Sequence, residues 1–149
     1  MTKNTGVITR LIRYSVKEHG GELLESAFFR AGTGMDGDFH AVGGERQISL
    51  LSAESREWMA ASSEQGLCFS RFKENLTVRG IALEKIKAGN RLAVGEVILE
   101  ISGILKHCHE ECPLFSTGSI CRLAGQSLFA KVVTGGEVRV GMRVKADGL

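Results

Sequence analysis

The stretch Leu92-Ala93-Val94-Gly95-Glu96-Val97-Ile98-Leu99-Glu100-Ile101 decides the fold class of this chain of 149 residues. Two apolar runs, 92–94 and 97–101, flank the dipeptide Gly95-Glu96. A two-residue connection with glycine first is typical of a tight β-hairpin, because glycine reaches the positive φ angle that such turns require. The stretch therefore predicts two short strands joined by a hairpin turn.

Runs of the same kind recur along the rest of the chain. They predict further strands over 7–14, 27–30, 47–51, 76–78, 129–133 and 138–140. Nineteen glycines against a single proline suit short strands joined by tight turns, and Gly135-Gly136 marks another such turn. We expect a mainly β protein, either a closed or partly closed β-barrel or a sandwich. A barrel would pair its edge strands and leave its mouth for a functional site.

One helix is expected among these strands. Ser52 is placed as its N-cap, with Glu54 and Glu57 in the first turns, where the helix dipole favours acidic side chains. The helix is expected to run through Ala61. Because no linker, repeat or low-complexity segment interrupts the chain, we expect a single domain over residues 1–149.

The composition restricts the possible classes of function. Nineteen basic and seventeen acidic residues, spread along the chain, leave a net charge of +2 and favour no nucleic-acid partner. No apolar run approaches the roughly 20 residues of a membrane span. The first residues are too short and polar a stretch for a signal peptide. Four cysteines in such a chain indicate a reducing, cytoplasmic compartment, in which thiols are more often catalytic or metal-binding than disulfide-bonded.

Two of these cysteines lie in the segment Cys108-His109-Glu110-Glu111-Cys112, which follows His107 and the strand expected at 97–101. A thiol has an unperturbed pKa of about 8.5, and a neighbouring imidazolium or a metal lowers it. The thiolate is both a nucleophile and a soft metal ligand, so the segment predicts sulfur chemistry or metal binding. The alternative is a pair of buried structural cysteines.

Several segments, taken in order, resemble the signatures of the MOSC domain, in its small stand-alone type with a Cys-His-x-x-Cys segment. The resemblance rests on residues 37–40, 46–54, 72–81, 89–95, the Cys108 segment, 129–132, Gly135-Gly136 and Val140-Gly141. It covers nearly the whole chain. It implies a barrel related to the β-barrel domain of pyruvate kinase, and a function in sulfur or molybdenum-cofactor chemistry.

The family is thought to carry sulfur as a cysteine persulfide or to bind the molybdenum cofactor (molybdopterin) through a cysteine thiolate. The resemblance places that cysteine on Cys108, as the catalytic thiol and molybdenum ligand, with Cys112 as a second thiol. No pyridoxal-phosphate domain fits in this length, so this chain alone binds no pyridoxal phosphate. A cysteine desulfurase or another sulfur donor would have to load it, and a molybdoenzyme or a cofactor-biosynthesis protein would be the partner it serves.

The cofactor's pterin and phosphate would need hydrogen-bonding and cationic groups. The candidates are Asp38, His40, Arg46, Asn75 and His109, together with the Gly34 to Gly37 loop, Lys73 and Arg79. Asp38 and His40 are suited to orienting a ligand or to proton transfer, and a turn-stabilising aspartate and a half-buried histidine are the structural alternatives. For Arg46 the alternative is an exposed surface arginine. Glu74 and Asn75 are expected either to line the pocket or to cap a turn. Glycine and aspartate interleaved over 31–38 predict a loop whose amides are free to meet a ligand. Cys108 is expected at a cleft shared with residues 34–40.

Two other functions remain open at this level. One is a zinc-binding structural module that uses Cys108, His109, Cys112 and Cys121, since zinc takes tetrahedral sets of Cys and His. The other is a small molybdenum-dependent reductase of N-hydroxylated compounds, which would need electron-donor partners. Cys68 is the cysteine expected in the core.

Overall fold

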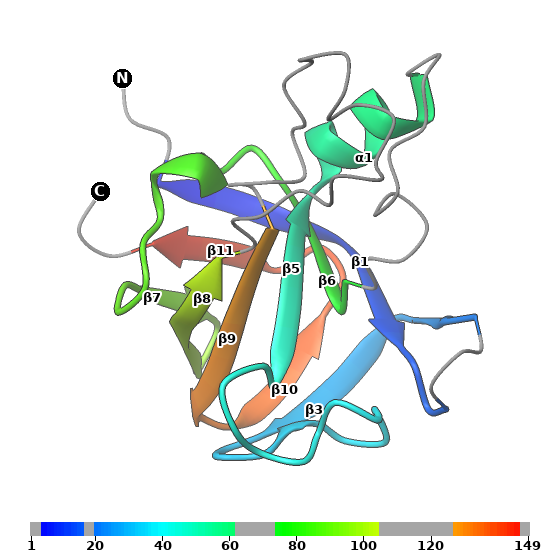
Figure 1. Ribbon diagram of the computed structural model, residues 1–149, viewed down its shortest axis with the longest axis vertical. Helices are drawn as coiled ribbons and strands as arrows, with labels where there is room; N and C mark the ends of the chain where they lie inside the picture. The colour runs from blue at the N-terminus through cyan, green and yellow to red at the C-terminus, as the bar shows by residue number, and fades with distance from the viewer. Residues whose placement is uncertain (1–3, 17–19, 62–73, 105–126, 147–149) are drawn as a thin grey trace, which may run out of the picture.

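Seven β-strands close into a ring in the computed structural model, which describes residues 4–16, 20–61, 74–104 and 127–146 (Figure 1). They are β1 (Thr5–Arg13), β5 (Ile48–Ser52), β6 (Leu76–Arg79), β7 (Arg91–Val94), β8 (Val97–Ile104), β9 (Ser127–Thr134) and β11 (Arg143–Ala146). Their order is β11-β7-β8-β9-β5-β6-β1, and a further pairing of β1 with β11 completes the ring. Val7 pairs with Arg79 of β6 on one edge and with Arg143 of β11 on the other. The closed β-barrel is confirmed, and this seam excludes the sandwich.

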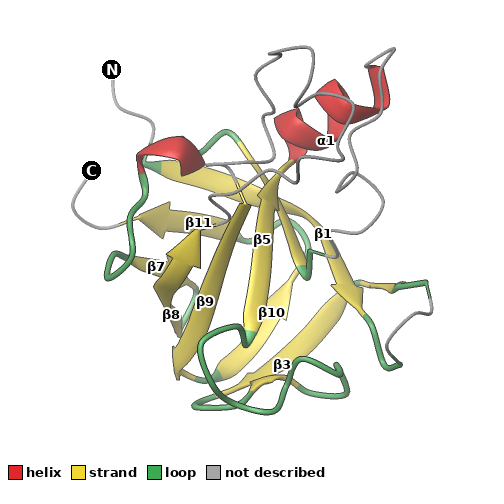
Figure 2. Cartoon of the chain, in the orientation of Figure 1, coloured by secondary structure: helices red, strands yellow, loops and turns green. Residues whose placement is uncertain are grey.

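A ring of seven strands cannot be antiparallel throughout, because strand directions would have to alternate around an odd number. The parallel pair is β5 with β6, in which Leu50 lies opposite Leu76. A parallel pair needs a long crossover connection. Helix α1 (Ala53–Ala61) begins this connection directly after β5 and lies at the end of the barrel toward which β5 points (Figures 1 and 2).

The remaining elements are short. Strand β2 (Glu22–Leu24) pairs with β1, and β10 (Gly136–Arg139), β3 (Ser26–Arg30) and β4 (Gly34–Met35) form a separate three-stranded sheet. A 3-10 helix, η1 (Leu83–Lys85), follows β6. Strands β2, β4 and β11 were not predicted from the sequence. Only β11 carries a usable signal, since its residues alternate between exposed and buried.

Local expectations are confirmed at both the hairpin and the helix. Val94 pairs with Val97 across a two-residue turn, and Gly95 has a φ of 61°. The Ser52 hydroxyl accepts a hydrogen bond from the Ser55 amide at 3.0 Å, as an N-cap does. In the described part of the chain no helix is long and apolar enough to cross a membrane.

The expectation for the glycine-rich segment 31–38 is corrected. Four of its amides donate to backbone carbonyls at 2.9 to 3.1 Å: Gly32 to Val132, Thr33 to Arg30, Asp36 to Phe28 and Asp38 to Met35. Within the segment, β4 pairs with β3. These four amides are satisfied by the protein itself and are not free to meet a ligand.

The core fills the inside of the barrel with alternate residues of each strand. Leu11, Leu50, Leu76 and Leu99 are fully buried in one cluster. Since successive side chains of a strand point to opposite faces, the neighbours of these residues lie on the outer face of the barrel. Among them Ser49 of β5, Asn75 just before β6 and Thr77 of β6 are polar and buried, and they belong to the site described next.

Candidate functional site

Buried polar side chains gather on the outer face of β5 and β6, where the two strands run parallel. The cluster comprises Asp38, Ser49, Glu74, Asn75 and Thr77, each at most 6% exposed. Ser49, Asn75 and Thr77 alternate with core residues, and Glu74 lies two residues before the start of β6. Buried polar groups are stable only when they are hydrogen-bonded, so the partners of each one define the site.

Asp38 is the centre of one half of the cluster. Its Oδ1 accepts hydrogen bonds from the Tyr14 amide at 2.7 Å and from Asn75 Nδ2 at 3.1 Å. Its Oδ2 accepts from the His40 amide at 3.0 Å and contacts His40 Nδ1 at 2.7 Å. Burial by itself raises the pKa of Asp38, but the hydrogen bonds from His40 and from the Tyr14 amide outweigh it and leave the pKa below its usual range. Asp38 is therefore an ionised carboxylate.

His40 is oriented by this carboxylate. Because an ionised carboxylate only accepts hydrogen bonds, Nδ1 of His40 carries the proton shared with Asp38. The ring packs on Phe39 with 3.9 Å between centroids and meets the edge of Tyr14 at 6.5 Å. With Nδ1 committed and the side chain 27% exposed, Nε2 is the nitrogen that can take up a proton or bind a ligand.

Asn75 joins this half of the cluster to the barrel. Its Nδ2 donates to the Ile12 carbonyl and to Asp38, both at 3.1 Å. Its Oδ1 accepts from the Ser49 amide at 3.0 Å and from the Ser49 hydroxyl at 3.2 Å. Both donors and the acceptor oxygen of the Asn75 amide are thus used within the protein, and Asn75 positions Asp38. Direct binding of a cofactor by Asn75 stays a prediction.

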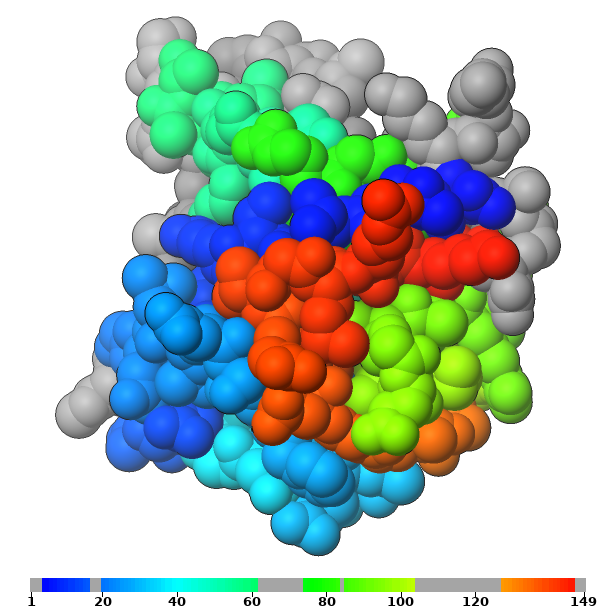
Figure 3. Space-filling model, turned by 180° about the vertical axis from the view of Figure 1, so that it is seen from behind, coloured from blue at the N-terminus to red at the C-terminus, as the bar shows by residue number. Residues whose placement is uncertain are grey.

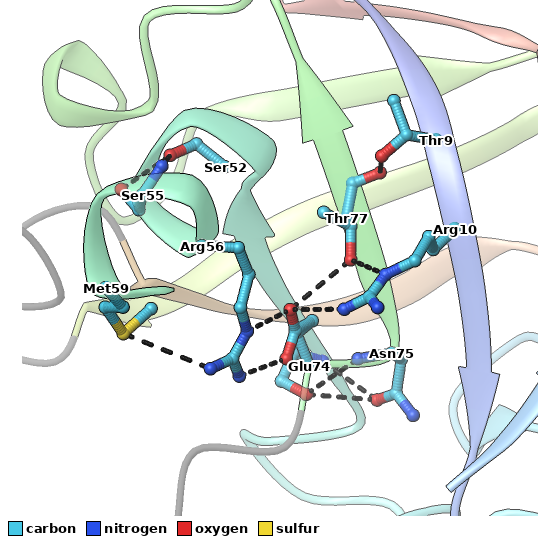
Figure 4. A network of polar contacts seen from close by, with 10 residues as sticks. Thr9, Arg10, Ser52, Ser55, Arg56, Met59, Glu74, Asn75 and Thr77 are labelled. Carbon is cyan, nitrogen blue, oxygen red and sulfur yellow. Dashed lines mark hydrogen bonds and ion pairs between the residues drawn. The ribbon is translucent and has the colours of Figure 1, made fainter. Parts of the chain in front are cut away.

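Glu74 is the centre of the other half. Arg56 of α1 donates to both of its oxygens, from Nη2 at 2.6 Å and from Nε at 2.9 Å, and the Thr77 hydroxyl donates at 3.3 Å. Arg10 of β1 approaches from the other side, with Nη2 at 3.6 Å (Figure 4). The hydrogen bonds to Glu74 raise the pKa of Arg56, so the Arg56 guanidinium stays charged.

Tyr14 contributes a buried phenol ring beside His40. Burial, followed by the charge of Glu74, raises the pKa of Tyr14 to about 12, and the charges of Arg56 and Asp38 also act on it. Tyr14 therefore keeps its proton at neutral pH, and its amide and ring contact the Asp38–His40 half of the cluster. The site as a whole combines an oriented imidazole, a protonated phenol and guanidinium groups, which suits binding and proton transfer.

The other predicted site residues lie elsewhere or outside the described part of the chain. Arg46 is exposed, and its guanidinium lies 4.5 Å from the centre of the Phe129 ring. Cys108, His109 and Cys112 fall outside the described residues, as do Cys68, Cys121 and Lys73. Among the residues that are described, no group of three or more His, Cys, Asp or Glu could hold a metal ion.

Four residues of this site were candidates from the sequence: Asp38, His40, Glu74 and Asn75. The structure joins Asp38, His40 and Asn75 in one group of hydrogen bonds. Sequence reasoning missed Tyr14, Arg10 and Arg56. Arg10 lies in a strand and Arg56 in a helix, and neither carries a local motif. Only the pairing of β1 with β6 and the packing of α1 on β6 bring them to Glu74.

The described residues form a closed barrel of seven strands with helix α1 at one end and a polar cluster on the outer face. This architecture places the protein among the small β-barrel domains. The sequence profile of the MOSC domain matches residues 18–145, so the chain belongs to the MOSC domain family. No curated protein matches the chain in a sequence comparison.

Solved structures share this fold. The YuaD protein of Bacillus subtilis is 18% identical, with a TM-score of 0.73 over 95% of each chain. YiiM of Escherichia coli is 17% identical, with a TM-score of 0.62 over 100% of this chain and 71% of that chain. YiiM of Geobacillus stearothermophilus is 12% identical, with a TM-score of 0.60 over 98% of this chain and 75% of its own. At these identities the likeness establishes the fold.

Proposed function

We propose that this protein is a sulfur carrier or cofactor-binding protein of molybdenum-cofactor metabolism that uses Cys108 as its reactive thiol. The observation that carries the proposal is the match of the MOSC domain to residues 18–145, a range that includes Cys108 and Cys112. Membership of this family indicates a role related to the molybdenum cofactor. The use of Cys108 follows from the sequence of its segment, in which two imidazoles adjoin the thiol.

The described residues fit an anionic cofactor with many hydrogen-bonding groups. His40 is held by Asp38 with its second nitrogen available, and Arg10 is about half exposed with two long contacts. The cofactor would supply molybdenum, which is soft enough to take a thiolate ligand. Cys108 would be that ligand, and His40, Arg46, Asn75 and His109 would bind or position the pterin. Asp38 holds the proton on Nδ1 of His40, so that proton exchange with a ligand takes place at Nε2.

Sulfur transfer needs only thiol chemistry. The Cys108 thiolate attacks the outer sulfur of a persulfide on a donor protein. The sulfur–sulfur bond of the donor breaks, the donor leaves as a thiolate, and Cys108 becomes the persulfide. The Cys112 thiolate can then attack Sγ of Cys108, which releases hydrosulfide and leaves a disulfide between Cys108 and Cys112. Two cellular thiols reduce that disulfide and are themselves oxidised.

These steps define the partners and the compartment. The donor is a cysteine desulfurase or another protein that carries a persulfide, because Cys108 receives its sulfur from such a group. The acceptor is a molybdoenzyme or a cofactor-biosynthesis protein. A reducing cytoplasm is the compartment in which the disulfide would be recycled.

Sulfur uptake can be followed by intact mass after incubation with a cysteine desulfurase and cysteine, without reductant. Wild type and Cys112→Ser should gain one sulfur atom, and the adduct should last longer in Cys112→Ser because the resolving thiol is gone. Cys108→Ser should gain none, and Cys68→Ser should behave as wild type. If Cys108→Ser takes up sulfur and binds cofactor as wild type does, Cys108 has no part in the function.

Metal analysis separates this proposal from the zinc module. Protein produced with molybdenum cofactor supply should carry molybdenum and pterin that are lost in Cys108→Ser. Stoichiometric zinc that persists regardless of cofactor supply would instead support the structural alternative.

A further inference from the structure

A pocket of about 420 Å³ lies between α1 and the outer face of β1 and β6. Figure 3 shows α1 beside β1 on the face seen from behind. Besides two alanines of α1, the pocket is lined by Thr9, Arg10, Arg56, Glu57, Thr77 and Arg79. Three separate elements thus each contribute one arginine to a single pocket.

The three guanidinium groups are bound to the protein to different degrees. Arg56 is fixed by its two short hydrogen bonds to the buried Glu74. Arg10 makes two longer contacts, 3.6 Å from Nη2 to Glu74 and 3.5 Å from Nε to the Thr77 hydroxyl (Figure 4). Contacts of this length are weaker than a hydrogen bond of ordinary geometry. Arg10 therefore keeps most of its hydrogen-bonding capacity for a ligand.

Arg79 is paired with Glu57 of α1, and the two side chains are 48% and 61% exposed. An exposed pair of this kind contributes little to stability, because water solvates both partners and the side chains lose entropy when they meet. Glu57 can therefore move away from Arg79 at little cost when an anion arrives. The pocket then presents three guanidinium groups near two carboxylates, Glu74 and Glu54, the second of which accepts a hydrogen bond from the Gly80 amide beside Arg79, so a net positive charge remains.

The charge and the size of the pocket indicate the ligand. Guanidinium groups bind phosphate through paired hydrogen bonds, and the positive charge left after Glu57 has moved favours an anion. A volume of about 420 Å³ lies in the range of sites for small organic molecules, roughly 300–1,000 Å³, so the phosphate would carry an organic group. We propose that the pocket formed by Arg10, Arg56 and Arg79 binds a phosphate monoester of a small molecule. Arg79 was a sequence-based candidate for a phosphate, whereas Arg10 and Arg56 were not.

Binding can be measured by calorimetry at constant ionic strength with phenyl phosphate, inorganic phosphate and phenol. Phenyl phosphate should bind the wild type most tightly of the three. Arg10→Gln and Arg79→Gln should each weaken it roughly tenfold or more, since each loses a charge-assisted contact. Both side chains are about half exposed, so circular dichroism and the melting temperature should show that these variants fold.

Arg91→Gln is the matched control. Arg91 is also an exposed arginine, paired with Glu100 on β8 away from the pocket, and its loss should leave the affinity unchanged. Cys108→Ser should also bind phenyl phosphate normally, so that a failure of the proposed cysteine chemistry leaves this proposal standing. Equal affinity of Arg10→Gln, Arg79→Gln and wild type would overturn it. So would inorganic phosphate or phenol binding as tightly as phenyl phosphate.

Discussion

Asp38 holds separate parts of the chain together with one carboxylate. Its four contacts come from the end of β1, from the start of β6 through Asn75, and from its own turn at His40. The carboxylate is buried, and each of its oxygens has two partners. Asparagine has the same shape, but one of the two carboxylate oxygens would become an NH2 group. That NH2 group would face N–H donors that now have an acceptor, so these donors would be left without one.

Asp38→Asn should therefore lower the free energy of unfolding at neutral pH by about 2–3 kcal/mol, as measured by urea denaturation. The folded-state pKa of Asp38 lies below the unfolded value of about 3.9. Its contribution is therefore complete above that value and is lost as the pH falls through the folded pKa. The acid-induced loss of stability should be smaller in Asp38→Asn than in wild type.

Asp36→Asn is the control for that measurement. Hydrogen bonds from Arg30 lower the pKa of Asp36 as well, but this pair is exposed. Its removal should leave the stability at neutral pH unchanged within error. An Asp38→Asn variant that unfolds at the same urea concentration as Asp36→Asn would contradict the central role of the buried carboxylate.

At the scale of elements, α1 is attached to the barrel by charge as well as by packing. Two of its residues form ion pairs with β6 or with the segment just before it: Arg56 with the buried Glu74, and Glu57 with the exposed Arg79. The two pairs differ chiefly in their exposure to water. They allow a direct comparison of a buried ion pair with an exposed one on the same helix.

Glu74→Gln should lower the free energy of unfolding by about 3 kcal/mol, because it leaves the Arg56 guanidinium partly buried without its counter-charge. Glu57→Gln should have no measurable effect on stability, since its pair is exposed. Chemical denaturation of both variants checks this, and hydrogen exchange should show faster exchange in 53–61 for Glu74→Gln alone. Equal stability of the two variants would show that α1 is held by packing only.

At the scale of the whole molecule, the barrel depends on β1 pairing along both of its edges. Gly6 lies at this seam, opposite Val144 of β11. A Cβ atom at Gly6 would come within 2.6 Å of the Arg79 carbonyl oxygen in β6. That carbonyl belongs to the backbone, so the strand itself would have to move.

Gly6→Ala should therefore destabilise the protein by about 1–3 kcal/mol, through overpacking at the seam. Gly20→Ala is the matched control, because a Cβ there meets nothing within 4 Å and the residue lies outside the barrel. Melting temperatures of the two variants should differ accordingly. A Gly6→Ala variant as stable as Gly20→Ala would mean that the seam tolerates a wider spacing than the structure shows.

The sequence by itself determined the local features of this protein, because they depend on neighbouring residues. The hairpin at Gly95-Glu96 follows from glycine in a two-residue turn, and the start of α1 follows from the Ser52 hydroxyl and the Ser55 amide. The mainly β class and the family also follow from patterns along the chain. Strands β2 and β4, of three and two residues, were not predicted because they are too short to show a period.

The tertiary structure alone decided the closure of the barrel and the make-up of the site. Arg10 and Glu74 are 64 positions apart and Asp38 and Asn75 are 37 apart, so no local pattern reports that they meet. Closure depends on the sum of strand twist and register around seven strands, which brings β1 back to β11. Burial then determines which partners are needed, since the buried Glu74 carboxylate just before β6 is stable only where α1 supplies the Arg56 guanidinium.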